Sequence, residues 1–448
     1  MKRRPPAMLR SAILGAALLC ALVDVEPVSA HNTLEDSSPA EGAALTASPP
    51  TWTLRFTGTV PLDSASGQII DGRGVRTTLE DPVHGESQNV IVFALPPDLS
   101  GEVTARWRLV GVDGHVISGR VSFGVNSGVF PPATESSPTV DPAGSDESGE
   151  LIASRSLPEP ATYGIRLLDI LVLLAILGLI LVELRIAQGV TAIGFGTRLT
   201  EFGPLVLVAT GSLQALAFAA EMENTNLFGS LGAIRPALGT TPGAMAFMQP
   251  ALAGLVAIQL RKRSWLATKS RTNILLFSAS LLLLARAYSG HPRSDGYPLI
   301  GIPIDMLHTA AAGIWLGGLA ILISSVVPVV NDLSAEQAFR SFGKYARAAV
   351  GTILATGFIQ TVNLHGGVGA ILATSHGRTL LFKLVFVVGM LGFGFANNRR
   401  ITRRPSVGSV GQNTMRNIIR ASLVETALGI CVIALTALLV VSSLNDVS

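Results

Sequence analysis

A histidine and a short acidic motif in the first part of the chain have the residue types of a metal site. If the segment before His31 is removed, its free amine and its imidazole become available to one metal ion. Asp113 and His115 flank Gly114, so a strand or a turn can point both side chains at the same ion. Copper(II) prefers nitrogen and oxygen ligands in a tetragonal plane, which these groups supply. Alone, the Asp-Gly-His triplet is typical of a polar turn, but its pairing with an N-terminal histidine favours a copper(II) site.

The first thirty residues have the order of a secretory signal peptide. Basic residues come first, an apolar run covers residues 13–23, and the small residues Val28, Ser29 and Ala30 follow. We therefore predict a signal peptide over residues 1–30, with cleavage after Ala30 exposing His31. The alternative, a retained anchor, is disfavoured because about a dozen apolar residues are too few to span a bilayer.

Residues 31–126 are predicted to form a small all-β sandwich of the immunoglobulin-like or cupredoxin-like Greek-key kind. Short apolar or alternating segments are separated by Pro and Gly residues, and the clearest of them are 52–56, 89–95, 103–110 and 121–125. Fewer than a hundred residues with this spacing suit a sandwich. Residues 127–160 are rich in Pro, Ser and acidic residues, which is typical of a flexible linker.

Residues 161–448 are predicted to form an all-α polytopic membrane bundle. The whole chain has a mean hydropathy of +0.49 and only 14% charged residues. Its second part contains about eight apolar runs close to the ~20 residues that a membrane helix needs. They cover residues 165–184, 203–220, 244–260, 273–288, 303–328, 346–362, 380–396 and 418–444.

The distribution of basic residues predicts which way the bundle faces. Lys and Arg are concentrated in alternate loops, and the positive-inside rule places those loops in the cytoplasm and the N-terminal domain outside. With this orientation His291, His308, His365 and His376 all fall outside or in the outer half of the membrane. Such a distribution is expected of a protein that handles metal at its outer face.

Asp305 and His308 are candidate ligands inside the membrane half. They lie three residues apart on one helical face, which Ala312 and Trp315 continue. Ionisable groups are costly against lipid, so this face should look into the bundle. With His291 just outside, the pattern predicts a copper relay of His291, Asp305 and His308. The alternative is an aspartate–histidine pair that caps the helix.

Three further charges fall within the apolar runs. Asp169 follows Arg166 by one helical turn, so an ion pair between them would explain it. Lys383 can extend its ammonium group toward the membrane surface. Glu425 has no such explanation, which leaves both a structural role and a role in a proton or ion path open.

The exported half resembles the CopC family of periplasmic copper-binding proteins. The resemblance rests on His31, on the segment 38–42 (Ser-Pro-Ala-Glu-Gly), and on Trp107-Arg108, Asp113-Gly114-His115, Ser118-Gly119 and Phe123. It implies a β-sandwich that binds copper(II) through His31, Asp113 and His115. Val116 departs from the proline found there in many relatives. No Met occurs between residues 9 and 221, so we expect no soft copper(I) site in this domain.

The membrane half resembles the CopD family, which is often fused to CopC in this order. The matching segments are Ser289-Gly290-His291, Asp305-Met306-Leu307-His308, Trp315-Leu316-Gly317-Gly318-Leu319, Arg340-Ser341-Phe342, residues 377–383 and Asn397-Asn398-Arg399. The resemblance implies a multi-pass protein of the bacterial inner membrane that passes copper towards or across the bilayer.

Together these features predict a copper-handling membrane protein that is not an enzyme. Its expected partners are the copper ion, the lipid bilayer and periplasmic copper carriers. No phosphate-binding glycine loop occurs, and the basic residues cluster in the loops between apolar segments rather than forming a nucleic-acid surface, so neither a nucleotide nor a nucleic acid is expected. Two alternatives remain open: a histidine-brace copper oxidase, and a haem-containing metalloreductase with His308 and His365 as haem ligands.

Overall fold

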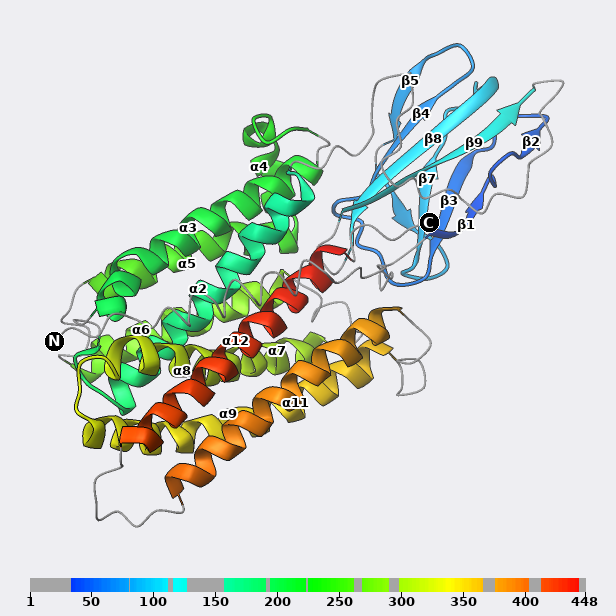
Figure 1. The fold of residues 1–448 in the computed structure, drawn as a ribbon. Coiled ribbons are helices and arrows are strands. Elements are labelled where there is room, and N and C mark those ends of the chain that lie inside the picture. The colour runs from blue at the N-terminus through cyan, green and yellow to red at the C-terminus, as the bar shows by residue number, and fades with distance from the viewer. Residues whose placement is uncertain are drawn as a thin grey trace.

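The structure is a computed structural model, and it describes residues 34–79, 81–111, 116–126, 157–190, 194–222, 225–261, 268–289, 298–365, 375–402 and 412–442. An all-β part is followed by an all-α part, as the sequence predicts (Figure 1). The strands are β1 (Leu34–Ser38), β2 (Ala44–Leu45), β3 (Thr51–Phe56), β4 (Ser66–Ile70), β5 (Arg76–Leu79), β6 (Val83–His84), β7 (Val90–Ala94), β8 (Gly101–Val110) and β9 (Val116–Val125).

Two sheets face each other in the β part. One has the strand order β1-β3-β7-β6 and the other the order β2-β9-β8-β4-β5. Every second residue of β3 is buried, so that Trp52, Leu54 and Phe56 enter the interior, as Ala105 and Trp107 do from β8. The period of two along each strand therefore produces the core, and the predicted strand segments correspond to β3, β7, β8 and β9.

The longest strands, β8 and β9, pair along their whole length. Their register runs from Gly101 opposite Val125 to Val110 opposite Val116. Gly119 lies opposite Trp107, and a Cβ atom at this position would lie 2.9 Å from atoms of the indole ring. The Trp107 ring is packed edge-on against Phe56, with 5.0 Å between the ring centroids. A glycine at 119 thus makes room for the central aromatic pair of the core.

The helices are α2 (Glu159–Arg185), α3 (Gly194–Met222), α4 (Ser230–Gly239), α5 (Thr241–Arg261), α6 (Lys269–Tyr288), α7 (Pro298–Ala312), α8 (Gly318–Ile321), α9 (Asp332–His365), α11 (Ser375–Thr402) and α12 (Gln412–Ser442), with π-helical turns η4 (Gly313–Gly317) and η5 (Leu322–Val326). The segments from α7 to η5 follow one another without a break. In Figure 1 the sandwich lies at the end of the bundle where α3 ends and α4 begins, and β9 contacts α3.

Six of the described helices are long and apolar enough to cross a membrane, which makes this a multi-pass membrane protein. They are α2, α3, α5, the rod from α7 to η5, α11 and α12. The predicted number of eight is therefore not confirmed. The two other predicted runs, 273–288 and 346–362, lie in α6 and α9, which carry basic or polar residues over much of their length.

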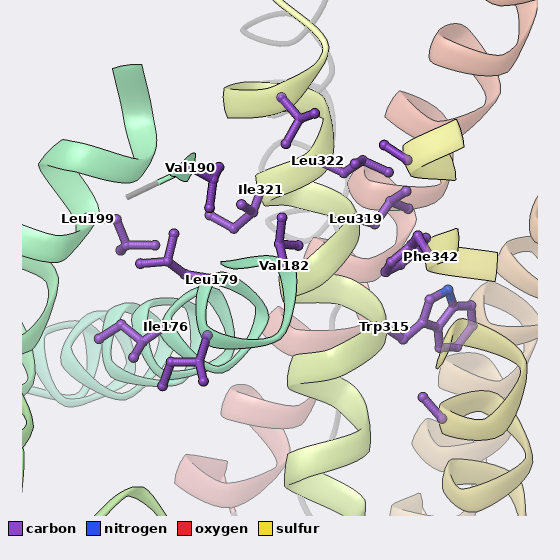
Figure 2. Packing of buried hydrophobic residues seen from close by; sticks show 14 of the residues in the cluster. Ile176, Leu179, Val182, Val190, Leu199, Trp315, Leu319, Ile321, Leu322 and Phe342 are labelled. Atoms are coloured by element: carbon purple, nitrogen blue, oxygen red, sulfur yellow. The ribbon is translucent and has the colours of Figure 1, made fainter. Parts of the chain in front are cut away.

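Helix α2 packs against α3, α12 and the π-helical turn η4. A Cβ at Gly317 would lie 1.8 Å from the Leu174 carbonyl oxygen, and one at Gly178 would lie 2.0 Å from the Gly317 carbonyl carbon. Only glycine allows these two backbones to approach so closely. Figure 2 shows Ile176, Leu179 and Val182 of α2 beside Val190, Leu199 and Ile321, whereas Trp315 lies apart from them, near Phe342.

Replacing Gly119 by alanine should destabilise the sandwich. The added methyl group must displace the buried Trp107 ring, and overpacking of this kind costs about 1–3 kcal/mol. Thermal unfolding of the purified protein, followed by near-ultraviolet circular dichroism, should show a lower midpoint for the β part. The neighbouring change Ser118→Ala adds no atom beside Trp107 and is the control. Equal midpoints for the two variants would contradict this account of Gly119.

Candidate functional site

The structure describes two of the six predicted ligand residues, Asp305 and His308. His31, Asp113, His115 and His291 lie outside the described residues. Within the described ranges no three His, Cys, Asp or Glu side chains gather as a metal-binding group. The predicted sites therefore stay predictions, and the structure describes the elements that flank them or carry Asp305 and His308.

Two contacts locate the start of β1 and the end of β8 relative to each other. Strand β1 begins at Leu34, opposite Phe56, whose ring packs on Trp107. Beyond Phe56 the chain reaches Ser64, whose hydroxyl accepts a hydrogen bond of 2.9 Å from the Val110 N–H. The start of β1 and the end of β8 therefore lie at the same end of the sandwich.

The segment 38–42, part of the resemblance to CopC, fastens the chain after β1 to β9. The Glu41 carboxylate accepts a hydrogen bond of 2.8 Å from the Ser122 N–H, and the Gly42 N–H donates one of 2.7 Å to the Ser122 carbonyl. Gly42 has a φ of 74°, a conformation that glycine adopts without strain. The acidic residue and the glycine thus hold the β1–β2 connection against the strand that follows residue 115.

In the bundle, Asp305 and His308 both face α9. His308 Nδ1 lies 2.9 Å from the Thr356 hydroxyl, and Gln360 Nε2 donates a hydrogen bond of 3.3 Å to Asp305. Thr356 and Gln360 are four residues apart and therefore lie on one face of α9. That face contacts the face of α7 that carries Asp305 and His308. Gly357 adjoins the His308 ring, where a Cβ would lie 3.5 Å from Cε1. This pairing holds the acid and the imidazole in fixed positions.

The hydrogen bonds of Thr356 determine which His308 nitrogen is available to a ligand. The hydroxyl has one proton, which it donates to the Thr352 carbonyl at 2.7 Å. It therefore accepts from His308 Nδ1–H, and Nε2 keeps the lone pair. Metal-bound histidines are commonly oriented in this way, by a hydrogen bond from the nitrogen that does not bind the metal.

Asp169 has a different partner from the expected one. Its carboxylate forms an ion pair with Arg286 of α6 and accepts a hydrogen bond of 2.6 Å from Thr210 of α3. The expectation of an ion pair with Arg166 is therefore wrong, because α6 brings a second arginine to the same depth. Only 2% of Asp169 is exposed, so this interaction joins three helices inside the bundle.

Glu425 of α12 meets Trp315 on the π-helical turn η4. The indole Nε1–H donates a hydrogen bond of 2.7 Å to the Glu425 carboxyl group, and the two residues are 4% and 5% exposed. Gly394 of α11 lies against the same carboxyl, where a Cβ would be 3.0 Å from Oε1. Trp315 thus contacts a carboxyl group that the packing of three helices encloses.

Sequence reasoning missed Thr356, Gln360 and Arg286. Each is a polar residue within an otherwise apolar run, and this feature of the sequence could have marked them as residues that face the interior of the bundle. Their partners on other helices could not be found without the packing of α7 on α9 and of α6 beside α2 and α3.

Comparisons with known proteins agree with a β-sandwich joined to a membrane bundle. Residues 34–126 match the CopC domain, and residues 336–439 match Copper resistance protein D. One chain thus contains matches to both of these models. It is similar to "Copper transport protein CutJ" of Bacillus subtilis (strain 168), with 26% identity over 429 residues that cover 91% of this chain and 73% of the relative.

Solved structures of CopC proteins are similar to the sandwich. The crystal structure of CopC from Methylosinus trichosporium OB3b is 24% identical, with a TM-score of 0.20, and covers 22% of this chain and 100% of its own. PcoC, described as a methionine-rich copper resistance protein from Escherichia coli, is 22% identical, with a TM-score of 0.19, and covers 21% of this chain and 98% of its own.

Replacing Arg286 by methionine should destabilise the bundle, because it leaves the Asp169 carboxylate buried without its cation. Removing one partner of a buried ion pair typically costs about 3–5 kcal/mol. Thermal unfolding of the detergent-solubilised protein should show a lower midpoint. The double variant Asp169→Asn/Arg286→Met should recover much of the loss, since the buried charge is gone. A double variant less stable than Arg286→Met would contradict this explanation.

Proposed function

We propose that this protein binds copper(II) in its exported β-sandwich and passes copper to the helical bundle for transport across the membrane. The observation that carries the proposal is the combination of a CopC domain and a CopD region in one chain. The similarity to a copper transport protein over 91% of the chain supports the same role. The copper ion is the cargo rather than a resident cofactor, and no catalytic step is part of the proposal.

The proposed copper(II) site consists of His31, Asp113 and His115. His31 precedes Leu34 by three residues, a span of at most about 11 Å in an extended chain. Asp113 and His115 belong to the segment between Val110 and Val116, which are paired across the hairpin. Because Leu34 and Val110 lie at one end of the sandwich, both chain segments start within reach of a common ion.

The proposed relay into the membrane consists of His291, Asp305 and His308. The lone pair on His308 Nε2 and the neighbouring Asp305 carboxylate offer nitrogen and oxygen ligands in the first half of the rod from α7 to η5. The sandwich lies at the end of the bundle where α3 ends, which supports transfer from one part to the other (Figure 1). We propose that this end is periplasmic and that periplasmic carriers deliver the copper.

The direction of transport that we propose is inward. An interior-negative membrane potential favours the entry of a cation by ~2.3 kcal/mol per charge per 100 mV, so nucleotide hydrolysis is not required.

Replacing His31 by alanine should weaken copper(II) binding by the full-length protein. The change removes an imidazole from the proposed site, and a loss of at least about tenfold in affinity, ~1.4 kcal/mol, is expected. Competition with a chelator of known affinity measures it. His84→Ala is the matched control, because His84 belongs to the same domain on the short strand β6. Mass spectrometry of the purified protein tests whether Ala30 is the last residue removed. Unchanged affinity in His31→Ala would contradict the proposed site.

Replacing His308 by alanine should leave copper(II) binding to the sandwich unchanged but slow copper uptake at least about tenfold, because the relay loses its imidazole. Uptake is measured in proteoliposomes with a copper indicator inside. Thr361→Ala is the control, since Thr361 follows Thr356 by five residues on the same helix and its hydroxyl donates a hydrogen bond of 2.8 Å to the Gly357 carbonyl of α9. Equal uptake by His308→Ala and the parent would remove His308 from the path.

A further inference from the structure

Glu425 lies at the midpoint of the candidate membrane span Asn413–Ala437. It is 4% exposed, and the hydrogen bond that the structure gives it comes from a neutral donor, Trp315 Nε1, at 2.7 Å. An ionised carboxylate at this depth is costly unless a cation accompanies it. A carboxyl group in such surroundings therefore holds either a proton or a cation.

The neighbouring elements do not supply a permanent cation to Glu425. The segments η4, α8 and η5 carry no titratable side chain. The described charged groups on the other helices packed against α12 are Arg166, Asp169, Glu183 and Arg185 on α2, Glu336, Arg340, Lys344 and Arg347 on α9, and Lys383, Arg399 and Arg400 on α11. Among the described residues none of these forms an ion pair with Glu425. Some of them have other ion-pair partners: Asp169 pairs with Arg286 of α6, and Arg340 pairs with Glu336 within α9.

A file of polar side chains leads from Glu425 towards the end of the bundle where α11 ends and α12 begins. Ser422 precedes Glu425 by three residues and is 1% exposed, and its hydroxyl accepts a hydrogen bond of 3.0 Å from Asn397 of α11. Arg400 in turn donates to the Asn397 side-chain oxygen at 3.4 Å. We place this end at the cytoplasmic face because its loop is rich in basic residues. Ser422 and Asn397 give the packing between Glu425 and this face a polar character, which favours the approach of water to the carboxyl group.

Glu425 also contacts the rod that carries the proposed relay, through Trp315 on η4. Trp315 follows His308 by seven residues, which is two helical turns and about 10 Å along the axis. Asp305, His308 and Trp315 thus follow one another from the outer end of the rod to the membrane centre. Copper leaving the relay inward approaches Glu425 next.

We propose that Glu425 is a proton-exchange residue that controls the passage of copper. At rest the carboxyl group holds a proton. When a copper cation arrives from the relay, the O–H bond breaks and the proton passes to water on the cytoplasmic side, so that the carboxylate offsets one charge of the cation. When copper leaves, water on that side returns a proton to the carboxylate. This inference rests on the proposed function, because it requires copper to reach the bundle.

The single carboxyl favours a proton over a resident metal ion. Within the described residues no three His, Cys, Asp or Glu side chains gather as a metal-binding group at this point. A lone carboxylate with one indole donor does not complete the coordination shell that a copper ion requires.

Copper uptake into proteoliposomes should depend on the pH at the cytoplasmic face. Acid on that side keeps the proton on Glu425 and should slow uptake. Acid on the outer side should slow uptake less. Glu425→Gln, which has no proton to release, should slow uptake at least about tenfold and abolish the dependence on cytoplasmic-side pH. Glu425→Asp, which keeps a carboxyl group, should retain part of the uptake rate and part of its dependence on cytoplasmic-side pH. Glu183→Gln is the matched control, because Glu183 is also buried at 2% exposure but accepts its hydrogen bond from the Gly189 backbone.

Uptake and pH dependence in Glu425→Gln equal to those of the parent would overturn the inference and leave the proposed function intact. Failure of the parent itself to take up copper would overturn the proposed function. Infrared difference spectra of parent minus Glu425→Gln separate the two cases. A carbonyl band of a protonated carboxyl that disappears on adding copper supports the inference, and absence of this band contradicts it whatever the uptake.

Discussion

The close approach of α2 to the π-helical turn η4 is the contact on which the arrangement of the bundle depends. Gly178 and Gly317 bring the two backbones together, and the Cβ distances of 1.8–2.0 Å leave no space for any other residue. This contact fixes the rotation of the rod from α7 to η5. Asp305 and His308 then face α9, while Trp315 faces Glu425 on α12.

The π-helical turn has a second consequence. A π turn contains one more residue than the α-helical turn it replaces, and such turns are frequent at functional sites. Here the turn carries Trp315, so the same local irregularity that packs against α2 also presents the indole N–H to a buried carboxyl. Packing and polar chemistry are therefore coupled at the membrane centre.

The sequence predicted most of the architecture because its periodicities are strong. Alternation in 52–56 and continuous apolar runs such as 165–184 need no tertiary information to be recognised. The sequence did not predict side-chain partners correctly where those partners come from helices distant in the chain. Arg286 rather than Arg166 pairs with Asp169, and Thr356 and Gln360 meet α7 only because α9 packs on it. The predicted roles of His31, Asp113, His115 and His291 remain proposals.

The central claim is that the β-sandwich captures copper for entry through the bundle. Copper content of the cytoplasm, measured by mass spectrometry in cells grown at low external copper, tests it most directly. Cells that produce the full chain should contain more cytoplasmic copper than cells that lack it or that produce it without residues 31–126. Equal or lower cytoplasmic copper in cells with the full chain would contradict the account.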